Sequence, residues 1–376
     1  MGTHAWRNWR ASLQPTTEIP ARYEDAIYSD ARFLSERLEL GPYTILPTFA
    51  STAPMPVALV LRCEMRRSLE PGLIDHTTGK LLPADSSGYH GGTVSDELAA
   101  LLSLALGVRC RAGGTVRVWG LPDDDPVGYP MELDRQHLSR PGPPGLEVLP
   151  NVVRQVEFAD ASDLLSTFPH LGSEDASALA RAARLYANAL WWANEDTNFA
   201  WLQMVGAVEA AAARRNEAGQ QPLGTLEELQ PRLWEALDGA PKENKQKVAE
   251  FMVRQSSATR KFLGFVEHFA PHAPQPRPAF GLDWTRLRQH LRIIYDHRSR
   301  ALHDGRPFPH PMLDKPMQGP DGQPSEVPVG MSAAAMGSSW LAKEMPMLLH
   351  TFEYIARGAL LNWWHDLAPV VKSQPS

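Results

Sequence analysis

The segment Ile294-Tyr295-Asp296-His297-Arg298-Ser299-Arg300-Ala301-Leu302-His303-Asp304-Gly305 decides the fold expected of the C-terminal half of the chain. Five apolar residues around it recur at helical spacing and form one stripe: Leu287, Leu291, Ile294, Ala301 and Leu302. Arg298 falls in the middle of that stripe, where a guanidinium is costly unless another group pairs with it. His303 falls on the opposite face, and the Asp304-Gly305 pair is predicted to end the helix directly after it.

The spacing of Arg298 and His303 allows two interpretations. An arginine is a permanent cation, and a histidine titrates near neutral pH, so the pair suits work on a phosphodiester. In that interpretation His303 is a general acid and base, and Arg298 stabilises charge in the transition state. In the other interpretation the motif is a capped helix end, with Arg298 in a structural ion pair and His303 solvated.

Glu209 is the expected partner of Arg298. It lies on a helix face that is otherwise small and apolar, so its carboxylate also requires a partner. The pair either fixes the packing of two helices or orients Arg298 for chemistry, and both roles can hold together. Around the motif, Arg292, Ser299 and Arg300 are the predicted substrate-binding residues, because a basic cluster on one helix can hold phosphates. A solvated, charge-rich face is the alternative.

Composition limits the classes of partner. The chain has 376 residues and a formal net charge of -6, so any site for a polyanion must be local. The only cysteines, Cys63 and Cys110, lack the spacing of zinc ligands, and neither a metal nor a cofactor is predicted. The start lacks the apolar core of a signal peptide, and no apolar run is long enough for a membrane span. A cytoplasmic location is therefore expected.

The pattern along the chain predicts an α+β fold with two domains. Residues 1–170 are expected to form a β-rich N-terminal domain of unknown role, and residues 171–370 an all-α helical bundle. The strands expected in the first domain are 43–46, 57–63, 115–119 and 152–158, with a helix at 95–106. The helices expected in the second are 173–192, 197–215, 225–237, 241–270, 283–303 and 339–364. A proline- and glycine-rich loop is expected at 306–330.

Over roughly residues 172–366 the chain resembles the Apea-like HEPN domains of the HEPN superfamily. The most specific likeness is the segment 294–305, because such domains often show a tyrosine, then Arg-Ser, a basic residue, two apolar or small residues and a histidine. The second is Tyr186-Ala187-Asn188-Ala189-Leu190, followed by the helix that ends at Val208-Glu209-Ala210. Asp304 stands where many relatives have glycine, which comes one position later here.

The resemblance implies a helical bundle that forms a homodimer and brings two Arg/His motifs to one composite cleft. It implies metal-independent cleavage of RNA by attack of the ribose 2′-hydroxyl, with Arg298 and His303 catalytic and no cofactor. A role in a stress response or in defence against phage is therefore expected, with the N-terminal domain sensing a trigger, selecting the target or engaging a protein partner. The alternative is a non-catalytic module for RNA binding or dimerisation within a regulatory or defence complex.

Overall fold

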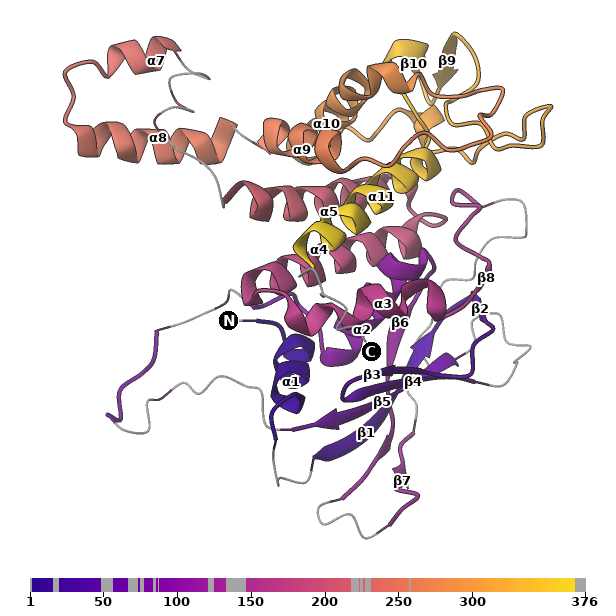
Figure 1. The fold of residues 1–376 in the computed structure, drawn as a ribbon. Helices are drawn as coiled ribbons and strands as arrows, with labels where there is room; N and C mark the ends of the chain where they lie inside the picture. Colours follow the sequence, from indigo (N-terminus) through magenta and orange to yellow (C-terminus); the bar gives the residue numbers. More distant parts are fainter. Residues whose placement is uncertain are drawn as a thin grey trace, which may run out of the picture. The chain divides into compact units, whose positions relative to one another are not determined.

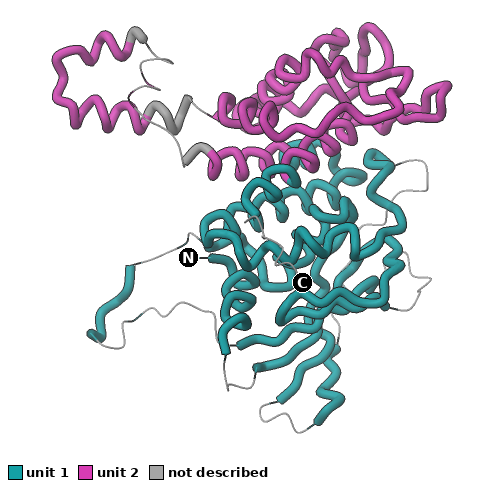
Figure 2. Tube along the Cα trace, viewed as in Figure 1, with its two compact units in different colours: residues 1–204, 361–376 teal, residues 205–360 magenta. Residues whose placement is uncertain are grey.

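Helices and an antiparallel sheet make up the fold, which confirms the α+β class. The structure is a computed structural model that describes residues 2–15, 20–48, 57–66, 74, 78–83, 86, 88–120, 125–132, 147–217, 223, 226, 231–256 and 258–368. The chain divides into unit 1, residues 1–204 with 361–376, and unit 2, residues 205–360 (Figure 2). This division falls inside a helix after Met204 rather than near residue 170.

Unit 1 contains a six-stranded sheet in the order β3-β4-β5-β1-β6-β7 (Figure 1). Its strands are β1 (Ala21–Tyr28), β3 (Leu38–Leu40), β4 (Tyr43–Pro47), β5 (Val57–Met65), β6 (Arg111–Val118) and β7 (Tyr129–Pro130). The central strand β1 pairs antiparallel with both β5 and β6. A separate parallel pair joins β2 (Arg32–Phe33) to β8 (Gln155–Val156).

Helix α2 (Val94–Leu106) is the core helix of unit 1, because every residue in it except Asp96 is buried. It contacts β1 and β6 of the sheet as well as α3 (Ala159–Ser166) and α4 (Ser173–Trp192). A capping box between Thr93 and Asp96 satisfies its first turn, and Gly107 ends it in the left-handed region at φ 67°. Burial on all sides explains why α4 belongs to the same unit as the sheet.

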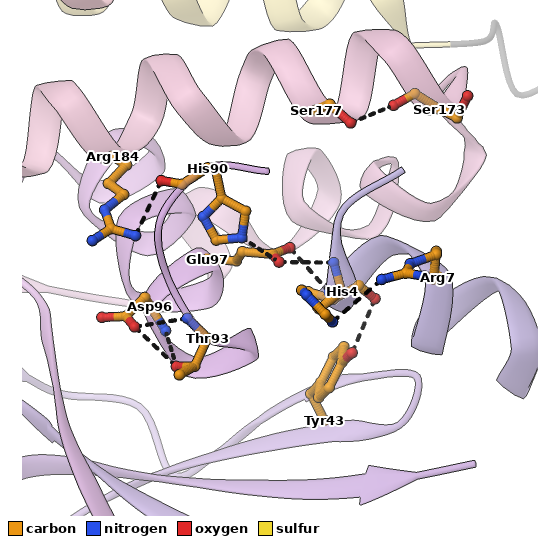
Figure 3. Close-up of polar contacts among 11 residues, drawn as sticks. His4, Arg7, Tyr43, His90, Thr93, Asp96, Glu97, Ser173, Ser177 and Arg184 are labelled. Atoms are coloured by element: carbon orange, nitrogen blue, oxygen red, sulfur yellow. Dashed lines mark hydrogen bonds and ion pairs between the residues drawn. The ribbon is translucent and has the colours of Figure 1, made fainter. Parts of the chain in front are cut away.

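A buried carboxylate fixes α1 (His4–Ser12) to α2, as Figure 3 shows. Glu97 accepts hydrogen bonds from the backbone N–H groups of His4 at 2.9 Å and Ala5 at 3.0 Å, which are free donors at the start of α1. His90 lies 2.7 Å from the same carboxylate, and its carbonyl accepts a bond from Arg184 at 3.2 Å. Glu97 therefore acts as the N-terminal cap of another helix.

Unit 2 is mainly helical. It takes in the greater part of α5 (Thr197–Glu217) and of α11 (Leu349–Leu367), each of which crosses the division between the units, with α7 (Pro231–Ala236), α8 (Lys242–Ser256), α9 (Ala258–Phe269) and α10 (Leu287–His303). Helix α10 contacts α9, and the rings of Phe262 and Tyr295 lie 5.2 Å apart between them. Asp283 caps the short 3-10 turn that leads into α10, and Gly305, at φ 66°, follows its end as predicted.

A hairpin in unit 2 lies outside the all-α expectation. Strands β9 (Ser332–Ala335) and β10 (Ser338–Leu341) pair antiparallel around a two-residue turn. Both turn residues have positive φ, 48° at Met336 and 74° at Gly337, as a two-residue hairpin turn of this kind requires. The prediction of an all-α second domain is therefore wrong in this segment.

Other predicted elements also differ from those observed. The predicted strand 152–158 is reduced to the two residues of β8, and the final helix begins at Leu349 instead of Ser339. The late start has two causes: residues 338–344 form strand β10 and a 3-10 turn, and Pro346 disfavours helical backbone at Met345. The single helix predicted over 241–270 is described as α8 and α9, and much of the helix predicted over 225–237 lies outside the described residues.

Candidate functional site

Arg298 and Glu209 form the predicted contact within unit 2. Arg298 Nη2 lies 2.6 Å from Glu209 Oε2, and the two side chains are 23% and 20% exposed. Helix α10 supplies the arginine and α5 the carboxylate, from residues 89 positions apart in the sequence. A charge-assisted bond of this length satisfies both ions where water is scarce. The expectation that these two charges pair is confirmed.

Tyr295 completes this contact. Its hydroxyl donates to Glu209 Oε1 at 2.8 Å, and its ring lies 5.6 Å from the guanidinium carbon of Arg298. Burial, and then the adjacent Glu209 carboxylate, raise the pKa of Tyr295 far above its usual value, so its hydroxyl stays protonated and remains a donor. Tyr295 was not among the predicted site residues. Its position three residues before Arg298 was the available signal, because such residues are neighbours on a helix.

His303 lies at the exposed C-terminal end of α10. It lies five positions after Arg298, so the two side chains leave the helix about 140° apart. Arg292 and Ser299 share the face of His303; Arg292 is exposed and Ser299 is half-buried. A single chain therefore aligns three of the predicted residues along one solvent-facing side of α10, with Arg298 on another side.

Arg300 and His297 of α10 line a cavity of about 760 Å³ in unit 2. His297 is only 6% exposed, and its Nε2 donates to the carbonyl of Glu344 at 2.7 Å. Burial lowers its pKa, which favours the neutral imidazole. The apolar stripe predicted for α10 is partly wrong, because Leu302 is 51% exposed while His297 is buried. The segment after α10 and the loop after β10 cover this side, which local spacing does not reveal.

Among the described ranges, no group of three or more His, Cys, Asp or Glu side chains is arranged to hold a metal ion. Cys63 and Cys110 are both buried free thiols, and burial raises the pKa of each to about 12, so neither is a reactive thiolate. No described helix combines the length and apolar character that a membrane crossing needs.

Comparisons with known proteins add no assignment to this geometry. No protein-family model matches the sequence, and neither the curated proteins nor the solved structures contain a significant match.

Proposed function

We propose that the chain is a metal-independent endoribonuclease of HEPN type in which Arg298 and His303 carry the chemistry and Glu209 positions Arg298. The observation that supports this most is the Arg298–Glu209–Tyr295 contact on the helix whose exposed end carries His303. The bond to Glu209 uses Nη2, and 23% of the Arg298 side chain is exposed, so the guanidinium can still donate to a ligand. A guanidinium fixed before the substrate arrives loses little freedom on binding a phosphate.

The proposed reaction uses a nucleophile that belongs to the substrate. The ribose 2′-oxygen attacks the adjacent phosphorus, the O2′–P bond forms, and the P–O5′ bond breaks. The products are a 2′,3′-cyclic phosphate and a 5′-hydroxyl end. His303 takes the proton of the 2′-hydroxyl and, as imidazolium, supplies the proton that O5′ needs. Arg298 stabilises the charge on the phosphorane-like transition state. DNA lacks the 2′-hydroxyl and is not a substrate.

The wider setting of the proposal follows the family likeness. The helical part acts as a HEPN-like bundle, and two copies of the chain form a homodimer that binds RNA. The sheet-containing part senses a trigger or engages a protein partner. The activity serves a stress response or defence against phage in the cytoplasm.

Incubation of the purified protein with RNA in EDTA tests this proposal. We expect the wild type to leave 2′,3′-cyclic phosphate ends, and His303→Ala and Arg298→Ala to lose about a hundredfold or more in rate. His365→Ala is the matched control, because His365 is also an exposed histidine in the last turn of a helix, α11. Absence of cleavage by the wild type, or equal cleavage by His303→Ala, contradicts the proposal.

A non-catalytic module for RNA binding or dimerisation is the second candidate. It is favoured by one specific observation: Arg298 already has a carboxylate partner and leaves α10 on a different side from His303. In that case wild type and His303→Ala bind RNA equally and neither cleaves it, whereas Arg298→Ala is destabilised. The same set of variants therefore separates the two candidates.

A further inference from the structure

The 760 Å³ cavity of unit 2 is built from segments that are distant in the sequence. Its walls come from the C-terminal half of α10, the stretch from Arg306 to Leu313 that follows it, and the turn and second strand of the β9–β10 hairpin. The volume lies in the range that small ligands occupy in proteins. Neither Arg298 nor Glu209 lines it, so it is a feature separate from their contact.

The cavity adjoins the end of α10 that carries His303. Arg300 lines it, and residues three apart on a helix are neighbours, so His303 lies beside Arg300. The backbone N–H of Arg306 donates to the carbonyl of Arg300 at 3.2 Å, which turns the chain back after the helix ends. His303 therefore lies between Arg300 and Arg306 in the sequence, in the turn that joins these two lining residues, although it does not itself line the cavity.

The charge of the wall favours an anion. Arg300 and Arg306 are permanent cations, and both are exposed residues. None of the described residues that line the cavity is acidic. Carboxylates outside the lining also act on it: Asp314 lies 3.9 Å from the imidazole of His310, and Asp296 and Glu344 are close enough to act on the imidazole of His297. Two guanidinium groups without a carboxylate among the lining residues suit a phosphate, which accepts several N–H donors at once.

The rest of the wall supplies aromatic surface and a fixed frame. Trp340 is half-buried on β10, and Phe308 is 1% exposed with its ring 5.8 Å from that of His297. The His297 bond to the Glu344 carbonyl ties the segment after the hairpin to α10. A planar ring beside an anion site is the combination that binds a nucleobase next to its phosphate.

We propose that this cavity holds one nucleotide of the RNA strand, adjacent to the phosphate that is cleaved at His303. Arg300 and Arg306 contact its phosphate, and Trp340 stacks on its base. The inference rests on the proposed function and deepens it, because it assigns Arg306 and Trp340 to substrate binding beside Arg300.

Binding of a short 2′-O-methyl RNA oligonucleotide, which has no free 2′-hydroxyl to attack the phosphate, tests the assignment in the full-length protein. We expect the double variant Arg300→Gln, Arg306→Gln to weaken binding about tenfold or more, and Trp340→Leu to weaken it about fivefold. Arg286→Gln is the matched control and is expected to change binding less than about twofold, because Arg286 lies about 21 Å along the helical segment from Arg300. Arg300 and Arg306 are exposed, so we expect the double variant to fold normally and any loss of binding to report on the cavity itself.

Binding of free uridine 5′-monophosphate tests whether the cavity takes a nucleotide of an RNA strand or a free nucleotide. We expect it to bind at least about a hundredfold more weakly than the oligonucleotide, because it lacks the contacts of the neighbouring nucleotides. Equal affinity for the free nucleotide, or unchanged oligonucleotide binding in all the cavity variants, overturns the inference.

Failure of this inference and failure of the nuclease proposal give different results. If the wild type cleaves RNA but the cavity variants bind the oligonucleotide normally, the inference is wrong and the nuclease proposal stands. If the cavity variants lose binding but the wild type cleaves nothing, the cavity is an RNA-binding site of a protein that is not a nuclease.

Discussion

The side chain of Arg298 is held by two contacts with different physical origins. The bond to Glu209 joins opposite charges, and the ring of Tyr295 offers its face to the same guanidinium at 5.6 Å. Glu209 is fixed in turn by the Tyr295 hydroxyl at 2.8 Å. An arginine has several rotatable bonds, and restraint from two sides leaves its guanidinium in one position before any ligand arrives.

Replacement of Glu209 separates positioning from folding. We expect Glu209→Gln to lower the free energy of unfolding by about 1–2 kcal/mol, because the partly buried Arg298 loses its counter-charge. His303→Ala is expected to change it by less than about 0.5 kcal/mol, since His303 is exposed. Urea unfolding measures both values. A Glu209→Gln variant as stable as the wild type contradicts a structural contribution from the pair, and normal cleavage by the folded variant contradicts the positioning role.

The need for a partner at Arg298 could be read from the sequence, because a charge on an apolar stripe is costly alone. Glu209 could be paired with it for the same reason. The burial of His297 could not be predicted from the sequence. Phe308 and the Glu344 carbonyl cover this side chain, and their positions depend on the path of the chain after α10. Local periodicity carries no information on that path.

At the level of elements, the start of α11 is fixed by polar groups from the preceding loop. His350 Nε2 donates to the Ser325 carbonyl at 2.7 Å, and Thr351 Oγ1 donates to the Glu326 carbonyl at 2.8 Å. The Glu326 side chain, itself buried, accepts bonds from Arg277 at 2.5 and 2.6 Å. These contacts fix the proline-rich segment 306–330, which has little regular secondary structure, against the start of α11.

Three histidines of unit 2 contribute to its pH dependence. Burial lowers the pKa of His290, His297 and His350 below the ordinary value of 6.5. Below pH 6.5 the unfolded chain therefore binds protons that the folded chain does not, so stability is complete above that pH and falls as the pH is lowered. Each histidine contributes a loss of up to about 1.4 kcal/mol at pH 5.5.

The variant His350→Gln isolates one of these contributions. Glutamine keeps an N–H donor and does not titrate, so we expect a smaller difference in urea stability between pH 7.5 and pH 5.5 than in the wild type. His365→Gln, at an exposed position, is expected to keep the wild-type difference. An unchanged difference in His350→Gln contradicts the role assigned to His350.

Most elements with a clear apolar period were predictable, among them β4, β5, α2, α4, α5 and α10. The central strand β1 was not, because its buried residues include Glu24 and Asp25, which are rare in buried strands. Their partners come from elsewhere: Arg62 donates to Glu24 at 2.8 Å, and the Ser95 hydroxyl donates to Asp25. Arg62 and Ser95 are 38 and 70 residues away, beyond any local pattern.

At the level of the whole molecule, the two compact units do not follow the change from strands to helices along the sequence. Helix α4 belongs to the unit that contains the sheet, since α2 packs against both. Composition marks the change of secondary structure near residue 170, but a unit is defined by which surfaces bury each other. The division after Met204 therefore could not be predicted from the sequence and became visible only in the three-dimensional fold.

The proposed nuclease has a consequence for the assembled molecule. Arg298 and His303 leave α10 about 140° apart, so one chain does not direct both at the same phosphate. In a symmetric dimer, a site made from Arg298 of one copy and His303 of the partner occurs twice. A mixed dimer of an Arg298→Ala chain and a His303→Ala chain has one site with both residues and one site with neither.

We expect each variant alone to be inactive and the mixed dimer to recover about half of the wild-type rate, because one of its two sites is complete. Co-expression of the two chains with different tags and two successive affinity steps yields only mixed dimers. Cleavage of RNA in EDTA is the readout. The control is a dimer of one wild-type chain and one chain with the double variant Arg298→Ala, His303→Ala, which contains the same number of substitutions as the mixed dimer. That control also keeps the wild-type chain intact, so it is expected to be inactive if both sites are shared between copies. Activity of this control, together with none in the mixed dimer, places the site within a single chain and contradicts the shared arrangement.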